Sequence, residues 1–344
     1  MSATVAQQLL KGPSEVPFDI MRVAYGVLQV RDVDASLHFY EELLGLRLTL
    51  RDGDVAYLKG WEERQHHSLV LRKGDTPAVE RLGFRVRTDH DLDLLADWYA
   101  ERGGTVRMGD ADLRGMTGRT LRVWDHLGTP LEFYVAMELL PSVLQDYHLH
   151  RGAPIMRFDH VNLHSSQLEE ALVHWQQLGF RCSEYISTDS QPERVTGAWM
   201  LRKPTVHDVA LTAGKGPRLH HLAMWVAEPN GILRLCDQLG GAHWTHAIER
   251  GPGRHGVSNA FFVYLRDPDG HRLELYTCDY YTGDPDHVPL RWSVNDPRCR
   301  SFWGTRAPDS WYDESSTLLG PDGTPVPTTE ATVDERDQHS EVMA

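Results

Sequence analysis

The chain repeats one pattern of residues, and this repetition limits the folds open to it more than any other feature. The segments "MRVAYGVLQVRDVDASLHFYEELLGLRL" from Met21 and "MRFDHVNLHSSQLEEALVHWQQLGFRC" from Met156 share an alternating strand, a helix-period stretch and a Leu-Gly pair. We expect the helices to end at Gly45 and Gly179, since glycine favours the position just after a helix. A repeat of this length predicts two related halves.

A second kind of segment follows each of these and has a similar plan. "RLGFRVRTDHDLDLLADWYAERGGTV" from Arg81 matches "RLHHLAMWVAEPNGILRLCDQLGGAHW" from Arg218, with a strand, a helix and a Gly-Gly pair. Each then closes on a turn and an alternating strand, "WDHLGTPLEFYV" and "RDPDGHRLELYT". The prediction is an α+β fold in which four βαβββ modules pair into two barrel-like domains.

The repeat also predicts where the parts of the chain begin and end. Proline, aspartate and tryptophan follow the last module, which favours an ordered extension over the second domain. The final residues have the composition of a disordered acidic tail. The expected parts are an N-terminal extension (1–20), a first domain (21–150), a second domain (151–281), an ordered extension or lid (282–319) and the tail (320–344).

Composition argues against several classes of function. The net charge of −14 and the lack of a basic cluster argue against nucleic acid as a partner. No apolar run reaches the length of a membrane span, and the N-terminus does not resemble a secretion signal. The four cysteines are far apart and show no metal-binding spacing. We therefore expect a cytoplasmic protein of 344 residues with two buried cores.

Each half serves as a control for the other, and the comparison isolates a candidate metal site. His160, His221 and Glu274 occur in the second half, and aligning the motifs places Tyr25, Phe84 and Glu132 opposite them. Two imidazoles and one carboxylate can bind a divalent metal on one face and leave the other positions open to substrate and oxygen. The second domain is thus expected to hold a metal, while Tyr25 and Phe84 fill the equivalent space in the first.

Each of these residues also has a structural interpretation. A single histidine on a strand is more often a hydrogen-bonded residue than a ligand, and Glu132 at the matching position favours a structural role for Glu274 as well. An inward-facing carboxylate, however, is costly to bury unless it is paired or binds a cation. The combination of His160, His221 and Glu274 therefore favours a metal site, and we expect a hydrogen-bonded structural role for Glu132.

At this point the chain resembles a known family. The four-module plan and the motifs "FDHVNLH", "VHDVAL", "RLHHLAMWV" and "RHGVSNAFFVYLRDPDGHRLELYT" are similar to those of the two-domain extradiol catechol dioxygenases of the vicinal oxygen chelate superfamily, and most of all to their homoprotocatechuate branch. The resemblance implies one Fe(II), or alternatively Mn(II), per subunit, held by His160, His221 and Glu274. It also implies a homotetramer, with the C-terminal extension as a lid.

The resemblance implies further site residues in this sequence. His207 would be an acid–base residue near the metal, Asn162 would lie beside bound oxygen, and His255 and Tyr264 would contact the substrate hydroxyls and ring. His67 occupies the position of His207 in the first half, so a structural role is the alternative there. The residues expected to line the pocket or hold a substrate carboxylate are Trp199, Arg250 and either Arg298 or Arg300, with the last choice left open.

Several functions compete. The expected reaction is cleavage of the ring of 3,4-dihydroxyphenylacetate beside its hydroxyls by O₂, which gives 5-carboxymethyl-2-hydroxymuconate semialdehyde. The alternatives are an extradiol dioxygenase for a biphenyl-type or unsubstituted catechol, an isomerase or lyase of the same superfamily, and a metal-free protein that binds an aromatic ligand. An arginine pair suits a carboxylate, whereas a biphenyl-type catechol would need an apolar pocket.

Overall fold

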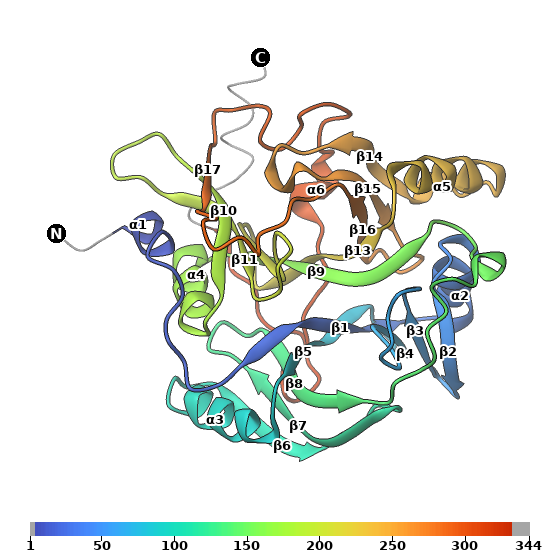
Figure 1. Cartoon of the computed structure of the whole chain (residues 1–344), viewed down its shortest axis with the longest axis horizontal. Coiled ribbons are helices and arrows are strands. Elements are labelled where there is room, and N and C mark those ends of the chain that lie inside the picture. The colour runs from blue at the N-terminus through green and yellow to red at the C-terminus, as the bar shows by residue number, and fades with distance from the viewer. Residues whose placement is uncertain (1–3, 332–344) are drawn as a thin grey trace.

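The computed structural model describes residues 4–331, and two large mixed sheets form its body, one above the other in Figure 1. The first sheet has eight strands in the order β2-β3-β4-β1-β5-β8-β7-β6, and the second has nine in the order β14-β15-β16-β13-β9-β12-β11-β10-β17. The first-sheet strands are β1 (Ile20–Val30), β2 (Arg47–Asp52), β3 (Val55–Lys59), β4 (Leu69–Lys73), β5 (Ala78–Val86), β6 (Thr105–Asp110), β7 (Met116–Trp124) and β8 (Pro130–Met137). Those of the second are β9 (Ile155–Ser165), β10 (Arg181–Ser187), β11 (Val195–Leu201), β12 (Val209–Ala213), β13 (Arg218–Val226), β14 (Ile248–Arg254), β15 (Phe261–Arg266), β16 (Arg272–Thr277) and β17 (Leu290–Ser293).

The strand pairing confirms the predicted α+β fold of four βαβββ modules. In every module the first strand pairs in parallel with the last, as in β1 with β4 and β9 with β12. Two modules then join through their first strands, so β1 pairs antiparallel with β5 and β9 with β13. The first strands of all four modules therefore lie at the centres of the two sheets, where their side chains are most deeply buried.

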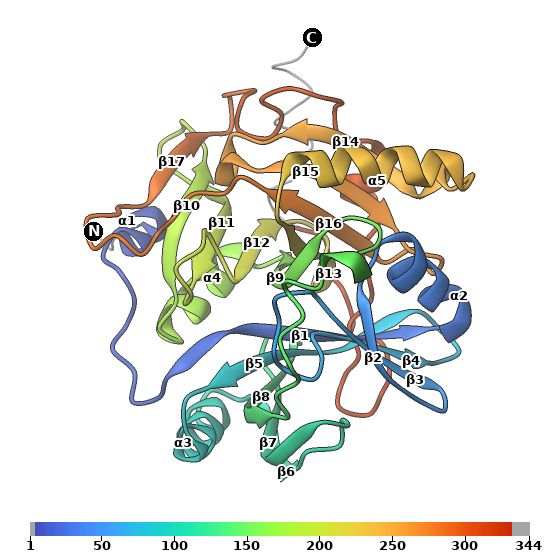
Figure 2. The same ribbon diagram turned by 45° about the vertical axis from the view of Figure 1, so that its right-hand side comes forward.

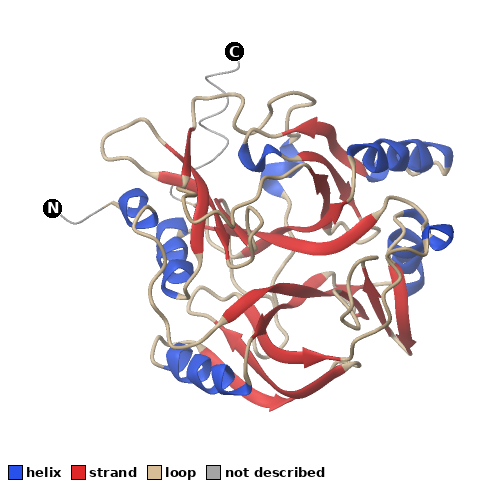
Figure 3. Cartoon of the chain, in the orientation of Figure 1, coloured by secondary structure: helices blue, strands red, loops and turns tan. Residues whose placement is uncertain are grey.

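Each module carries its helical segment on the outer side of its sheet, as Figures 2 and 3 show. The α-helices are α1 (Val5–Leu9), α2 (Val33–Leu37), α3 (Asp89–Ala100), α4 (Leu168–Gln177), α5 (Pro229–Gly241) and α6 (Asp309–Asp313). A π-helical segment, His38–Leu43, continues α2, and three short 3-10 turns cover Tyr147–Leu149, Thr245–Ala247 and Val257–Asn259. Gly45 and Gly179 end the helical segments with φ angles of +90° and +85°, in the left-handed region that glycine tolerates.

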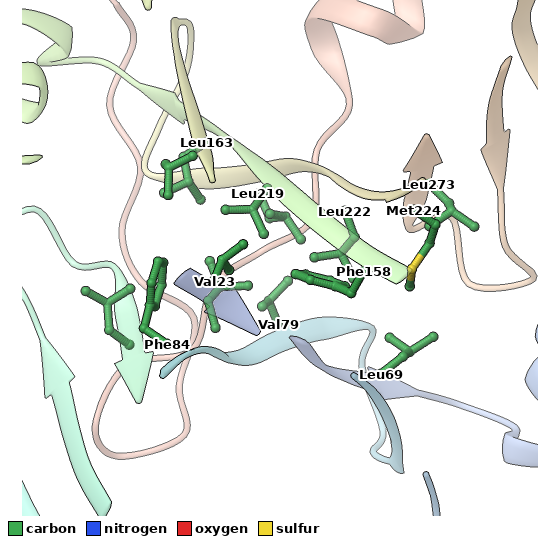
Figure 4. Close-up of a cluster of buried hydrophobic side chains, with 14 of the residues drawn as sticks. Val23, Leu69, Val79, Phe84, Phe158, Leu163, Leu219, Leu222, Met224 and Leu273 are labelled. Carbon is green, nitrogen blue, oxygen red and sulfur yellow. The ribbon is translucent and has the colours of Figure 1, made fainter. Parts of the chain in front are cut away.

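A hydrophobic core joins the two sheets face to face. Figure 4 shows its centre, where Val23 and Phe84 of the first sheet lie near Phe158 and Leu222 of the second. All four side chains are at most 2% exposed. The two sheets therefore share one core, and smaller clusters of buried residues lie apart from it, one in the first half and two in the second half of the described chain.

The C-terminal extension returns across both sheets and differs from the prediction for its last part. Residues 320–344 were expected to be disordered, but residues 320–331 are described and hydrogen-bonded. The backbone of Thr329 pairs with Gly216 of the second half, and Leu319 pairs with Pro325. Residue composition misses these backbone bonds, because they need no apolar side chain; residues 332–344 of the expected tail lie outside the described part. In residues 4–331, no helix is long and apolar enough to cross a membrane.

Candidate active site

Three side chains that could hold a metal ion meet at the centre of the second sheet. His160 lies on β9, His221 on β13 and Glu274 on β16, and these strands are neighbours in the sheet. Oε2 of Glu274 is 3.1 Å from Nε2 of His160 and 3.2 Å from Nε2 of His221. The three ligand atoms fall within 4.8 Å of one another, and all three residues are buried. This donor set fits a divalent metal such as Fe(II) or Mn(II).

A buried carboxylate fixes the ring of the first histidine. His160 donates from Nδ1 to Asp159, 3.1 Å away, and the hydroxyl of Tyr276 donates to the same carboxylate. Burial opposes the charge on Asp159, but the nearby Lys203 and His160 lower its pKa well below the usual value. The ionised carboxylate holds His160 in the tautomer that leaves Nε2 free to bind a metal.

A neutral partner fixes the second histidine. The Nδ1 atoms of His221 and His220 are 2.7 Å apart, and Nε2 of His220 donates to the carbonyl of Trp311 at 3.1 Å. A neutral His220 must then accept at Nδ1 from His221. Burial lowers the pKa of His220 well below its usual value, which agrees with a neutral ring. The hydrogen-bond chain therefore runs from a candidate metal ligand to the backbone of α6 in the extension.

These residues form one end of a cavity of about 330 Å³. Its wall is built from strands of the second sheet, from the turn at 255–260 and from the extension. Of the eleven residues named from the sequence, the cavity is lined by ten: His160, Asn162, Trp199, His207, His221, Arg250, His255, Tyr264, Glu274 and Arg300.

The remaining residue is Arg298, and the structure places it outside the cavity. Its side chain is 65% exposed and pairs with Asp296 at 2.7 Å. Arg300, only two residues later, is among the residues that line the cavity. Of the two arginines left open by the sequence, only Arg300 is therefore positioned to meet a ligand there.

His207 lies directly against the candidate metal site. Its ring centroid is 3.8 Å from that of His160, and its Nδ1 is buried with no hydrogen-bond partner in residues 4–331. Lys203 donates to the carbonyl of His207 at 2.6 Å and to that of Asp159 at 2.7 Å, so the loop before β12 is held in place. Burial lowers the pKa of His207 well below its usual value, and the neutral ring can accept a proton.

A second group of polar residues lies on β14, β15 and the turn between them. The hydroxyl of Tyr264 donates to Nε2 of His255 at 3.0 Å, while Nδ1 of His255 donates to the carbonyl of Arg300 at 2.6 Å. Burial lowers the pKa of His255 to about 3, so this ring is neutral. Arg250 donates to the carbonyl of Arg300 at 2.9 Å and stands over the ring of Trp311, 4.6 Å from its centroid.

The comparisons with known proteins agree with this geometry. Residues 22–133 and 157–275 match the sequence model of the Glyoxalase/Bleomycin resistance protein/Dioxygenase superfamily. The chain belongs to this superfamily. The two matched segments cover the two domain repeats, and the family resemblance drawn from the sequence is confirmed.

Individual members of the superfamily are similar over most of their length. A manganese-dependent 2,3-dihydroxybiphenyl 1,2-dioxygenase of Geobacillus genomosp. 3 is 31% identical over 83% of this chain and 94% of its own. The structure of an extradiol ring-cleaving dioxygenase from B. fuscum is 42% identical, with a TM-score of 0.90, over 94% of this chain and 89% of that one. Homoprotocatechuate 2,3-dioxygenase from Arthrobacter globiformis is 42% identical, with a TM-score of 0.88, over 92% of this chain and 98% of that one.

The strand register corrects the residue that the sequence comparison placed opposite His221. In the first domain, Tyr25 pairs with Gly83, and Gly83 pairs with Glu132. In the second domain, His160 pairs with Ala223 in the same way, and Ala223 pairs with Glu274. The same register places Arg81, not Phe84, opposite the position of His221. Phe84 points to the other face of its strand and packs in the core between the sheets (Figure 4).

The first domain therefore has a cation of its own at the position of the candidate metal. Arg81 donates to Glu132 at 2.9 Å, and the hydroxyl of Tyr25 donates to the other oxygen of the same carboxylate. A Cβ atom at Gly83 would lie 2.0 Å from the ring of Tyr25, so glycine is required there. The expected hydrogen-bonded structural role of Glu132 agrees with these contacts, whereas the expected filling of the space by Phe84 is wrong.

The sequence comparison also missed residues that touch the site. Trp311 lies on α6, 4.4 Å from the ring of Tyr264 and 4.3 Å from that of His220 between centroids. No repeat covers the extension, so no comparison between halves could identify Trp311. For His220 a signal was present, since it directly precedes His221, and an adjacent residue on a strand normally faces away unless a bulge turns it. The register shift between Leu219 and His221 is such a bulge.

Proposed function

We propose that the chain is an extradiol dioxygenase that inserts both atoms of O₂ into a catechol ring beside the hydroxyls, with 3,4-dihydroxyphenylacetate as its substrate. The observation that carries the proposal is one cavity with two chemically different parts. A two-histidine, one-carboxylate group occupies one part, and two arginines, the buried Arg250 and the half-buried Arg300, line the same cavity. The first part suits the vicinal hydroxyls and the second suits a side-chain carboxylate.

His160, His221 and Glu274 would hold one Fe(II) or Mn(II) per chain. A bound metal ion supplies a Lewis acid that favours the ionised catechol and connects the electrons of the ring with those of O₂. A dihydroxybiphenyl relative is named as manganese-dependent, so both metals stay open for this chain.

The protein side chains have complementary tasks in this proposal. His255 is neutral and accepts at Nε2 from the hydroxyl of Tyr264, which leaves the oxygen of Tyr264 to accept a hydrogen bond from a substrate hydroxyl. His207 and Asn162 lie on the metal side of the cavity, where His207 can hold and return a proton during cleavage of the O–O bond. Trp199 borders His207, with 6.4 Å between the ring centroids, and limits the space for water.

The charges in this part of the cavity favour one class of catechol over another. A biphenyl-type catechol would place an apolar ring against Arg250 and Arg300 and remove water from two charged groups, which costs free energy. A carboxylate on the substrate would instead pair with both guanidinium groups. The relatives include metapyrocatechases and biphenyl-diol dioxygenases, which is why unsubstituted catechol and 2,3-dihydroxybiphenyl are the substrates to compare. A homotetramer and a cytoplasmic location also stay predictions.

Anaerobic reconstitution with Fe(II), or separately with Mn(II), tests the proposal. Addition of 3,4-dihydroxyphenylacetate and air should give a yellow ring-cleavage product and matched uptake of O₂, and His221→Ala should give neither. Absence of both signals from the metal-loaded wild type would remove the dioxygenase proposal and favour an isomerase or a binding protein. Ring cleavage of catechol and 2,3-dihydroxybiphenyl with a kcat/KM equal to that of the carboxylate substrate would remove the substrate assignment alone.

A further inference from the structure

The first domain contains a second cavity, and the internal repeat places it at the counterpart of the candidate active site. Its volume is about 280 Å³, close to the 330 Å³ of the active-site cavity. Residues at the same six positions of the repeat line both cavities. They are Gln29, Arg72, Glu80, Arg81, Arg107 and Arg122 in the first domain, and His164, Thr212, His220, His221, Arg250 and Tyr264 in the second.

The strand pairing establishes this correspondence for the residues that matter most. Arg107 of β6 pairs with Arg122 of β7, which pairs with Glu132 of β8. In the second domain, Arg250 of β14 pairs with Tyr264 of β15, which pairs with Glu274 of β16. Arg107 therefore occupies the position of Arg250, the residue proposed to hold a substrate carboxylate.

The charges around the first-domain cavity balance in number, but one of its arginines lies outside the ion pairs. Its lining includes four arginines and one carboxylate, Glu80. Two further carboxylates, Asp112 and Glu132, pair with Arg81 and with Arg122. The carboxylate of Asp322, in the covering segment, interacts electrostatically with Arg107, so four positive charges stand beside four negative ones.

Arg107, an exposed residue of β6, is the arginine outside these ion pairs. In residues 4–331 it makes no ion pair with a carboxylate, while its guanidinium stands 5.1 Å from the ring centroid of Trp124. Its guanidinium donates a hydrogen bond to the carbonyl of Pro321 at 2.8 Å. In addition, Nε of Arg81 is buried without an acceptor in the described part of the chain. These donors are available to an anion in the cavity.

The C-terminal extension covers both cavities. Residues of its earlier part, including Trp311, line the active-site cavity, and Leu319, Gly320, Pro321 and Gly323 line the first-domain cavity. The indole of Trp124 donates to the carbonyl of Leu319 at 2.9 Å, which fixes the covering segment. Trp124 and Leu131 supply an apolar surface beside the positive charge.

We propose that the first-domain cavity binds a small aromatic carboxylate, with Arg107 pairing with the carboxylate and Trp124 and Leu131 contacting the ring. The size of the cavity, the guanidinium of Arg107 and the apolar side of the cavity all match a monoanion of this class. Arg81 takes the place of a metal there, so the cavity binds its ligand without transforming it. The inference concerns binding only and does not depend on turnover in the second domain.

Equilibrium dialysis of the Mn(II)-loaded protein with radiolabelled phenylacetate tests this site, since phenylacetate has a carboxylate but no hydroxyls. Arg107→Gln should remove one binding site per chain or weaken it about tenfold or more, because a charge-assisted hydrogen bond is lost. Arg119→Gln is the matched control, since Arg119 is a first-domain arginine on β7 that pairs with Asp89 and Asp93 and does not line the cavity.

The decisive quantity is the number of phenylacetate molecules bound per chain, which should be lower by one in Arg107→Gln than in the wild type. Equal binding by these two proteins, or equal losses in Arg107→Gln and Arg119→Gln, would overturn the proposal. Competition by the neutral analogue 2-phenylethanol at the same concentrations would overturn the carboxylate assignment. Any phenylacetate bound in the active-site cavity is sensitive to Arg250→Gln instead, so a failure of the proposed substrate is seen separately.

Discussion

Two arginines that are two positions apart in the extension have opposite surroundings. Arg298 is exposed and paired with Asp296, whereas Arg300 lines the active-site cavity and its carbonyl accepts hydrogen bonds from Arg250 and His255. The sequence could not separate them, because the extension has no repeated counterpart and both fit an alternating pattern. The structure separates them because the chain turns between them at Cys299, whose side chain is buried.

This contrast predicts the effect of two matched substitutions. Arg300→Gln should raise the KM for 3,4-dihydroxyphenylacetate by about 10-fold to 100-fold, because one charge-assisted contact to the carboxylate is lost. It should change the KM for unsubstituted catechol much less. Arg298→Gln should leave both constants within about twofold, as expected for an exposed ion pair. Steady-state oxygen uptake measures all four constants, and equal effects of the two substitutions would argue against a carboxylate site at Arg300.

At the scale of single residues, the sequence predicted the candidate metal group and seven further residues that line the cavity. The histidines and Glu274 stood out because the first half lacks the histidines at corresponding strands. The sequence comparison wrongly assigned Phe84 as the counterpart of His221. An alignment by the shared Arg-Leu pair ignores which face of the strand each residue occupies. Register shifts in β1, β5, β9 and β13 displace the alignment, and only the strand pairing reveals Arg81.

At the scale of elements, one buried carboxylate joins three parts of the second domain. Glu184 of β10 accepts hydrogen bonds from the backbone of Ser258, in the turn beside the cavity, and from the indole of Trp292 on β17. Burial raises the pKa of Glu184 from 4.5 to about 7. Protonation of this group in the folded state therefore contributes stability that is fully present below about pH 4.5 and is lost as the pH rises through about 7.

The Glu184→Gln variant should lack this pH dependence. The free energy of unfolding of the wild type, relative to the variant, should fall by on the order of 3 kcal/mol between those two pH limits. Urea unfolding at a series of pH values measures the difference. The variant also changes the hydrogen bond to Trp292, so the slope with pH and not the absolute stability is the relevant result. Parallel pH profiles of the two proteins would show that Glu184 does not titrate in this range.

The equivalent strands of the two domains allow a direct test of their correspondence. Combining Tyr25→His with Arg81→His should give the first domain the donor set of the second, because Glu132 shares the strand register of Glu274. The metal content after loading and gel filtration should rise from one to two equivalents per chain. Tyr25→His alone keeps Arg81 in place and should stay at one. A content of one in the double variant, with the fold intact by circular dichroism, would show that the two sites differ in geometry.

The elements themselves were mostly predictable, because hydrophobic alternation and glycines recur in every module. The segment at 320–331 was not. Its residues are polar and rich in proline and glycine, yet the backbone of Val326 bonds to Leu318 and that of Thr329 bonds to Gly216. Order in this segment depends on partners that lie far away in the sequence, and composition contains no information about them.

At the scale of the whole molecule, the end of the described chain connects the two sheets. Ser316 pairs with Leu219 of β13, and Leu318 pairs with Val79 of β5. The side chain of Leu318 is 0% exposed and belongs to the core shared by both halves. The repeats predicted the two sheets. They could not predict the face by which the sheets pack or the segment around Leu318 that joins them, because both depend on side chains of the two sheets together.

Removal of residues 316–344 should therefore destabilise both halves together. Loss of the buried Leu318 and of the backbone pairs should lower the free energy of unfolding by at least about 3 kcal/mol and lower the Tm of a single cooperative transition. A protein that lacks only residues 332–344 keeps every described residue and is the control. Differential scanning calorimetry distinguishes the cases. A normal Tm in the longer truncation would show that the extension follows the folded domains without stabilising them.

The ion pair of Arg81 with Glu132 has a consequence for how the protein meets a shortage of metal in the cell. This cation is part of the chain, so neither a chelator nor starvation can remove it, and the first half keeps its central contacts in either condition. Only the second half depends on supply from outside. We expect cells deprived of iron or manganese to accumulate a folded, idle protein that regains activity within minutes of metal addition and without new synthesis.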